Sequence, residues 1–69
     1  MIGEELRKAR LKAGLSQEEL AVQAGVHRTY ISLLERNKKS PTLNVLFRIC
    51  DALNVSPSRL IARVEKKQK

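Results

Sequence analysis

The amino-acid sequence predicts an all-α fold, a single compact domain of five helices over residues 1–69. Apolar residues recur every three or four positions through most of the chain, which is the spacing of one helix face. Glycine, serine, threonine and proline fall between these stretches, where such residues begin and end helices. No stretch alternates apolar and polar residues between turn signals, so no strand is expected. The chain contains no repeat or linker that would divide it.

The first two predicted helices are marked by their ends. Gly14 is expected to close the first helix in a left-handed conformation. Ser16 and Glu19 have the spacing of a capping box, so a second, short helix begins there and closes at Gly25. The inner side of the first helix consists of Ile2, Leu6, Ala9, Arg10 and Ala13, and that of the second consists of Leu20, Ala21 and Ala24.

The third helix is expected from about His27 to Arg36, with Asn37 as its left-handed terminator. Thr42 can cap a fourth helix that ends at Asn54, and this helix should be central because so much of its circumference is apolar. The inner side of the third helix consists of Ile31, Leu34 and Glu35. The apolar set of the fourth consists of Leu43, Val45, Leu46, Ile49, Cys50 and Leu53.

The fifth helix should begin after Ser56, which can cap it. Pro57 then occupies the first helical position, where a missing N–H has no energetic cost. Residues 65–69 are expected to be a frayed tail. The residues expected to dock the fifth helix are Leu60, Ile61 and Val64.

Charge and composition narrow the class of protein. Fourteen Lys and Arg against seven Asp and Glu give a net charge of +7, which favours a polyanionic partner such as nucleic acid or a membrane surface. One cysteine, Cys50, excludes an internal disulfide framework, and a single histidine makes a zinc site implausible, so no metal or cofactor is expected. The chain shows neither a leader pattern nor about 18 consecutive apolar residues, which predicts a soluble, cytoplasmic protein.

An enzyme is not expected from this sequence. The only histidine, His27, has no Ser and Asp partners in a catalytic pattern. The glycines are too scattered to form a phosphate-cradling loop, and no small-molecule substrate is expected. The acidic residues look like helix-terminal or exposed-face residues: Glu4, Glu5, Glu18, Glu19, Asp51 and Glu65.

The short connection between the second and third helices predicts a helix-turn-helix over about residues 16–36. Only residues 25–27 separate the two helices, so they must cross steeply. Ala21 is small enough to permit close crossing, and Gly25 can take the positive φ that the turn needs.

These residues together carry a family resemblance. The segment GLSQEELAVQAGVHRTYISLLERNKKSPTLNVLFRICDALNVS resembles the lambda and phage 434 repressor family of helix-turn-helix proteins, the Cro/C1 or Xre type. The resemblance runs from about Leu6 to Ile61, and the small size is similar to restriction-modification controller proteins and small phage-type regulators. It implies that the third helix enters the major groove of double-stranded DNA and that a homodimer binds half-sites about 34–36 Å apart. The spacing that carries it is that of Gln17, Leu20, Ala21, Gly25, Ile31, Leu34 and Glu35.

Four residues on the outward face of the third helix are candidates for base contacts. Arg28 has the forked donors that match guanine O6 and N7. Thr29 and Ser32 can hydrogen-bond to several bases, and the Thr29 methyl group suits a thymine methyl. Leu33 has two open interpretations, an apolar contact with a base or sugar and an ordinary exposed leucine.

Candidate phosphate contacts lie at the edges of the helix-turn-helix. The start of the second helix offers free N–H groups and a positive dipole end, and the resemblance implies a backbone-gripping glutamine at Gln17. Tyr30 is either a phosphate donor or a half-buried core aromatic. His27 stands where the family commonly has a small capping residue, and three interpretations of its imidazole stay open: it caps the helix, contacts phosphate or does neither. The full candidate set is Ser16, Gln17, His27, Tyr30, Arg36, Asn37, Lys38 and Lys39.

Two further interactions concern the scaffold. Arg10 lies on the apolar stripe of the first helix, and a buried guanidinium needs a partner. Glu35 lies on the inner side of the third helix, and the resemblance implies the same buried bridge between these two positions. Phe47 lies off the main stripe of the fourth helix, so it either covers the start of the fifth helix or joins a dimer patch with Leu60 and Val64.

The sequence therefore predicts a sequence-specific transcriptional regulator, a repressor or controller protein that binds an approximately palindromic operator as a dimer. The alternative is an antitoxin-like protein-interaction module in which DNA binding is secondary. RNA binding is less favoured because stacking platforms need aromatic side chains, and the chain has one Tyr and one Phe. A membrane-surface role is less favoured because the basic C-terminal stretch is short and polar.

Overall fold

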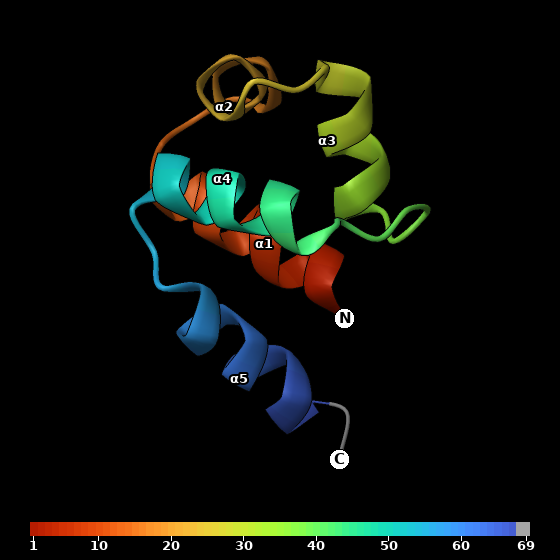
Figure 1. Ribbon diagram of the computed structural model, residues 1–69, viewed down its shortest axis with the longest axis vertical. Coiled ribbons are helices and arrows are strands. Elements are labelled where there is room, and N and C mark those ends of the chain that lie inside the picture. Colours follow the sequence, from red (N-terminus) through yellow and green to blue (C-terminus); the bar gives the residue numbers. More distant parts are fainter. Residues whose placement is uncertain (68–69) are drawn as a thin grey trace.

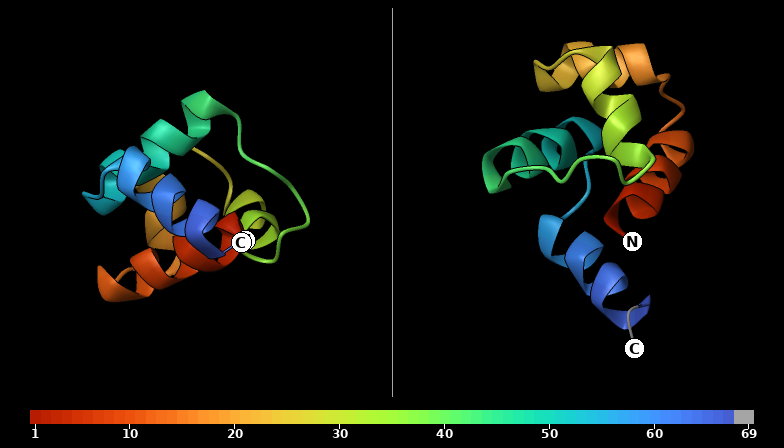
Figure 2. Two further views of the ribbon diagram at one scale, coloured as in Figure 1. Left: turned by 90° about the horizontal axis from the view of Figure 1, so that it is seen from below. Right: turned by 90° about the vertical axis from the view of Figure 1, so that its right-hand side faces the viewer.

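The computed structural model describes residues 1–67, and these residues form five α-helices. The helices are α1 (Ile2–Lys12), α2 (Gln17–Ala24), α3 (Arg28–Glu35), α4 (Leu43–Leu53) and α5 (Pro57–Lys67). Every regular element in this range is a helix, which confirms the all-α prediction. α1 and α4 lie in the middle of the molecule, with α2 and α3 at one end and α5 at the other (Figures 1 and 2).

The helix ends follow the capping residues of the sequence. Ser16 Oγ accepts the Glu19 N–H at 3.0 Å, and Glu19 Oε1 accepts the Ser16 N–H at 2.8 Å, so both halves of the capping box are present. Thr42 Oγ1 accepts the Val45 N–H at 3.2 Å at the start of α4. Positive φ angles follow the first four helices, at Gly14 (74°), Gly25 (72°), Asn37 (59°) and Asn54 (57°).

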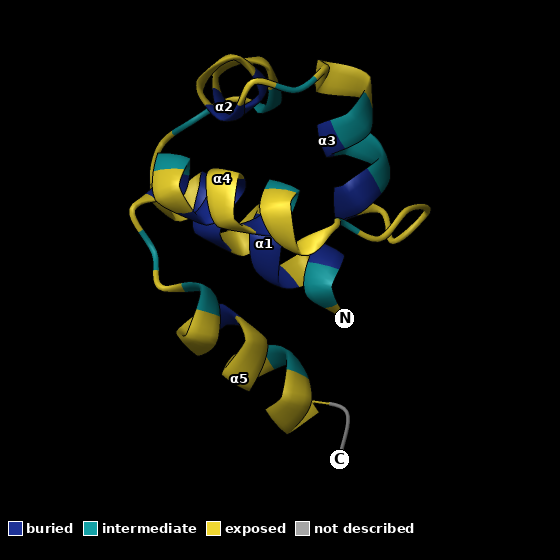
Figure 3. Cartoon of the chain, in the orientation of Figure 1, coloured by how far each residue is buried: buried dark blue, intermediate teal, exposed yellow. Residues whose placement is uncertain are grey.

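A single apolar core joins all five helices. α2 packs against α3 and α4, while α5 packs against α1 and α4. Figure 3 shows that the buried residues of α1 and α4 lie on their inward sides, whereas α5 is largely exposed. The largest buried side chains are Leu6, Leu20, Ile31, Leu34, Ile49, Cys50 and Leu60. This core sets the orientation of α2 and α3 relative to the other helices.

The frayed tail expected at residues 65–69 stays a prediction, and its first three residues are helical in the structure. α5 continues to Lys67, whose Nζ lies 2.6 Å from Glu5 Oε2. Residues 68–69 lie outside the described part of the chain. The sequence predicts that Ile61 helps to dock α5, but its side chain is 43 % exposed. Leu60 is the residue of this helix that is buried.

Glu5 also departs from the prediction of an exposed acidic residue. Its side chain is buried where α1 meets the last turn of α5, between Lys67 and Lys8 Nζ, which is 3.8 Å from Glu5 Oε2. Hydrogen bonding and charge attraction from Lys67 lower the pKa of this carboxyl below its ordinary value, against the opposing effect of burial. An ion pair between Glu5 and Lys67 therefore joins α1 to the last turn of α5.

Candidate nucleic-acid interface

The turn between α2 and α3 brings the two helices together at a steep angle. Gly25 has a φ of 72°, and the chain turns back on α2 through hydrogen bonds from the Val26 N–H to Ala21 O (3.0 Å) and from the Gly25 N–H to Val22 O (3.3 Å). Ala21 and Ala24 are buried beneath this turn. Their small side chains permit the close crossing that the sequence predicts.

The inner and outer faces of α3 are separated as the sequence predicts. Ile31 and Leu34 are buried in the core, and Glu35 is buried beside them. The outer face consists of residues that are exposed or partly exposed, namely Arg28, Thr29, Ser32 and Leu33. Among the described residues, Arg28 forms no ion pair with an acidic side chain, so its guanidinium donors are available to a ligand.

The C-terminal end of α3 is fixed by Glu35. Arg10 donates two hydrogen bonds to its carboxylate, from Nε to Oε2 at 2.7 Å and from Nη2 to Oε1 at 3.0 Å. A third bond runs from Arg10 Nη1 to Leu15 O at 2.9 Å. The carboxylate holds the pKa of Arg10 above its ordinary value, against the opposing effect of burial. α1 is thereby tied both to α3 and to the connection before α2.

Gln17 joins this network in a way that the sequence analysis missed. Its Nε2 donates to Glu35 Oε1 at 3.2 Å, so the first residue of α2 is bonded to the last residue of α3. Gln17 is partly exposed, and Ser16 beside it is exposed. The Ser16 hydroxyl accepts the Glu19 N–H at 3.0 Å. The candidate phosphate seat, by which we mean Ser16 and Gln17 at the start of α2, is therefore built on side chains that are held in place.

Glu19 adds a negative charge at this seat. The backbone N–H and then the hydroxyl of Ser16 hydrogen-bond to its carboxylate and lower its pKa below the ordinary value. The carboxylate is therefore ionised at neutral pH, where it stabilises the N-terminus of α2. The start of α2 therefore combines this negative charge with the positive end of the helix dipole.

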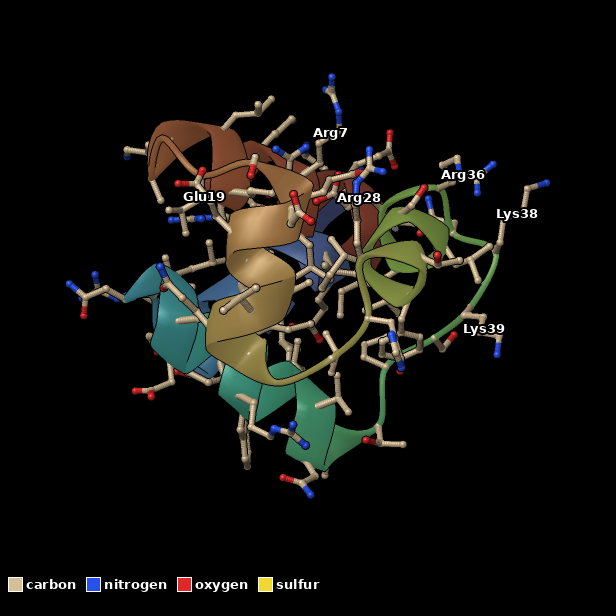
Figure 4. All side chains as sticks on the ribbon, turned by 90° about the horizontal axis from the view of Figure 1, so that it is seen from above. Arg7, Glu19, Arg28, Arg36, Lys38 and Lys39 are labelled. Carbon is tan, nitrogen blue, oxygen red and sulfur yellow. The ribbon has the colours of Figure 1, made fainter. Side chains whose placement is uncertain are left out.

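A positively charged edge follows α3. Arg36, Lys38 and Lys39 are exposed, and none forms an ion pair with an acidic side chain in residues 1–67. Figure 4 shows these three residues and Arg28 projecting outward from α3 and the loop after it. Arg7 of α1, which the sequence analysis did not single out, points outward on the same side as Arg28 and Arg36.

The other predicted phosphate residues have mixed surroundings. Asn37 ends α3, and its Oδ1 accepts the Gly3 N–H at 3.0 Å, so its side-chain oxygen is bound to α1. His27 is the N-cap of α3, but its imidazole makes no capping hydrogen bond, which removes one of the three roles considered for it. Tyr30 is partly buried and packs against the core.

One of the three residues predicted for a dimer patch, Phe47, Leu60 and Val64, is not on the surface. Leu60 is 1 % exposed and belongs to the core, because it docks α5 onto the other helices. Phe47 is 53 % exposed, and Val64 is partly exposed. Phe47 therefore remains available to a partner surface.

The hydrogen bonds of Arg48 to the turn are a second set of polar contacts that the sequence analysis missed. From the middle of α4 its Nε donates to Ala24 O at 3.1 Å, and its Nη2 donates to Gly25 O at 2.9 Å. Arg48 lies off the apolar stripe of α4 and is exposed. No sequence signal identifies a backbone carbonyl as its acceptor.

The described residues offer no group of three or more His, Cys, Asp or Glu side chains that could hold a metal ion. None of their helices has the length and apolar content needed to cross a bilayer. The residues gathered around α3 are donors and cations, which suit contacts with phosphates and base edges.

Five helices with α2 and α3 crossing at a glycine turn, and a polar outer face on α3, define a helix-turn-helix domain. The chain belongs to the Cro/C1-type helix-turn-helix family, because the family model HTH_3, Helix-turn-helix, matches residues 6–60. The resemblance inferred from the sequence is confirmed.

Individual relatives and solved structures agree with this family. The control protein C.SmaI of Serratia marcescens is 41 % identical over 63 residues, which span 91 % of this chain and 75 % of that protein. The crystal structure of the restriction-modification controller protein C.AhdI from Aeromonas hydrophila superposes with a TM-score of 0.83 at 36 % identity, covering 86 % of this chain and 89 % of that one. The crystal structure of the biofilm master regulator SinR in complex with DNA superposes with a TM-score of 0.84 at 37 % identity, covering 88 % of this chain and 98 % of that one.

Proposed function

We propose that this chain is a sequence-specific regulator of transcription that binds double-stranded DNA as a homodimer on an approximately palindromic operator. The observation that carries the proposal is the division of α3 into two faces. Its inner face is anchored through Ile31, Leu34 and Glu35, while its outer face presents Arg28 with no ion-pair partner in residues 1–67. Such a helix can enter a major groove without disturbing the core.

The relatives support the same function. SinR was solved in complex with DNA, and C.SmaI and C.AhdI are control proteins, the latter of restriction-modification. A controller or repressor role is therefore the one we propose for this chain. It acts by binding and not by catalysis, in the cytoplasm, with residues 1–69 as one domain.

In the proposed complex, two sets of residues have different tasks. Residues on the outer face of α3 contact base edges, and Arg28 is the strongest candidate because its fork matches guanine. Residues at the start of α2 and after α3 contact phosphates and set the register. The base-contacting set is Arg28, Thr29, Ser32 and Leu33, and the phosphate-contacting set is Ser16, Gln17, His27, Tyr30, Arg36, Asn37, Lys38 and Lys39.

A dimer is proposed because one α3 helix contacts too few base pairs for specificity in a genome. Two copies on a two-fold symmetric site double the contacts. Phe47 and Val64 are candidates for the surface between the copies, since both retain exposed apolar area. Analytical ultracentrifugation checks the proposal, and a monomer at tens of micromolar protein would contradict it.

Selection from a pool of randomised duplexes tests DNA recognition directly. The selected duplex and a scrambled duplex of the same composition are then titrated at two salt concentrations. We expect a two-fold symmetric consensus and a preference of about 10³-fold or more for the selected duplex. Salt-sensitive binding of both duplexes with equal affinity would reduce the proposal to nonspecific attraction between charges.

A further inference from the structure

Arg48 links the central helix α4 to the turn that precedes α3. Its Nε and Nη2 donate to the carbonyl oxygens of Ala24 and Gly25, at 3.1 and 2.9 Å. Ala24 is the last residue of α2, and Gly25 is its C-cap. A side chain from one helix therefore closes the end of another helix.

The two carbonyls need this donor. The turn uses the N–H groups of Gly25 and Val26 for bonds back to α2, and within residues 1–67 no backbone N–H donates to Ala24 O or Gly25 O. Both carbonyls also lie at the negative end of the α2 dipole, where a nearby cation is stabilising. One guanidinium satisfies both oxygens because its donors form a rigid fork.

The arginine and the turn fit closely. Leu46, two positions before Arg48, and Ile49, directly after it, are both buried, so the core fixes the backbone from which Arg48 projects. A Cβ atom added to Gly25 would lie 2.7 Å from Arg48 Nη2. A side chain at this position would make the guanidinium shift, and the φ of 72° independently favours glycine here.

The position of this contact matters for α3. The extensive contacts of α3 are with α1 and α2, and Glu35 holds its C-terminal end to α1. Its first residue, Arg28, follows Gly25 by only three positions. The angle at which α3 leaves the turn therefore depends on how firmly the turn is held, and Arg48 is its polar tie to α4.

We infer that Arg48 is a positioning residue for DNA recognition, which fixes the turn so that Arg28 meets a duplex at one angle. The inference rests on the function proposed above. Groups that recognise a ligand need support that holds them to within about 0.5 Å. Arg48 provides that support through hydrogen bonds to the turn, and its contribution depends on the fork and not on its charge alone.

Arg48→Lys is the variant that separates these contributions, because it keeps the charge and loses the fork. The control is Arg59→Lys, the same change at an exposed position of α5, at the opposite end of the molecule from the turn (Figure 1). Thermal unfolding followed by circular dichroism gives the highest temperature at which the unchanged protein and both variants are still folded. The measurements are then made below it.

The first measurement needs no DNA. Amide hydrogen exchange of Gly25 and Val26 should become about tenfold faster in Arg48→Lys, the equivalent of losing one hydrogen bond to a charged donor. The amide of Leu60 in α5 should keep its rate in both variants. Equal acceleration at all three amides would show a loss of global stability only and would overturn the inference.

The second measurement compares the selected and scrambled duplexes. Arg48→Lys should bind the selected duplex about tenfold more weakly and the scrambled duplex as well as the unchanged protein does. Arg59→Lys should change neither. An unaltered ratio of the two affinities in Arg48→Lys would overturn the inference. If the unchanged protein shows no sequence preference, the proposed function itself has failed, and this is seen before any variant is compared.

Discussion

Arg10 Nε lies 2.7 Å from Glu35 Oε2 and, with the bond from Nη2 to Oε1, forms a two-bonded pair between α1 and α3. The two side chains are only 9 % and 3 % exposed. Removing both charges from water is costly, and the cost is offset only while each has its partner. The attachment of α3 to α1 therefore depends on both residues at once.

Replacing one member of this pair should be severely destabilising. Glu35→Gln and Arg10→Met are each expected to lower the free energy of unfolding by about 3–5 kcal/mol, because a buried charge is left without its partner. Urea denaturation followed by circular dichroism measures the loss. The double variant Arg10→Met/Glu35→Leu should recover much of it, since no charge then remains buried. Single variants as stable as the unchanged protein would contradict the prediction.

Arg28→Ala should weaken binding to the selected duplex by about 1–3 kcal/mol and relax the preference at one base pair. The reason is that Arg28 begins α3, is exposed, and has no acidic partner among the described residues. Binding titrations against single-base variants of the selected duplex locate the affected pair. A uniform loss across all duplexes would assign Arg28 to phosphate contact instead.

Lys38→Ala should weaken binding to every duplex by a similar factor. An exposed lysine that contacts a phosphate releases about one counterion, so the slope of log affinity against log salt should flatten by about 0.9. Lys66→Ala is the matched control, because it removes the same charge from an exposed position of α5, the helix at the opposite end of the molecule from α2 (Figure 1). Equal salt slopes in Lys38→Ala and Lys66→Ala would remove Lys38 from the interface.

Glu5 should make stability depend on pH. Hydrogen bonding from Lys67 is the first reason that its pKa lies below the ordinary value of 4.5. A carboxyl whose pKa is lower in the folded protein contributes stability that is complete above the ordinary value and is lost as the pH falls through the folded value. Glu5→Gln should therefore be less stable at neutral pH, and its deficit should shrink below pH 4.5. Urea denaturation over a pH series measures the gap.

The control for this series is Glu65→Gln, which removes an exposed carboxylate from α5. It should leave stability nearly unchanged at every pH, because exposed ion pairs contribute little. A deficit in Glu5→Gln that stays constant from neutral to acidic pH would mean that the ionised form of Glu5 does not stabilise the fold.

The parts of the fold that local chemistry determines could be predicted from the sequence. Caps such as Ser16 and Thr42 act within three residues of themselves, and the apolar stripes repeat within each helix. The helix boundaries and the outward face of α3 follow from these short-range signals. The family resemblance added the pairing of Arg10 with Glu35, which lie 25 positions apart.

The contacts that were missed join distant parts of the chain. Arg48 finds its acceptors 24 and 23 positions away, on backbone carbonyls that any residue could supply. Lys67, in the last turn of α5, pairs with Glu5 of α1, yet each looks like an ordinary exposed charge in its own segment. Leu60 and Ile61 are adjacent and equally apolar, and only the way in which α5 docks decides which of them is buried.

The bond between Gln17 and Glu35 has a consequence for any ligand that Gln17 binds. A free glutamine side chain samples many rotamers, and restricting it costs up to about 2 kcal/mol of conformational entropy. Here folding has already imposed that restriction, because one Nε2 hydrogen is committed to Glu35 Oε1. The second hydrogen is preorganised, so an incoming acceptor meets an amide that no longer has to be immobilised.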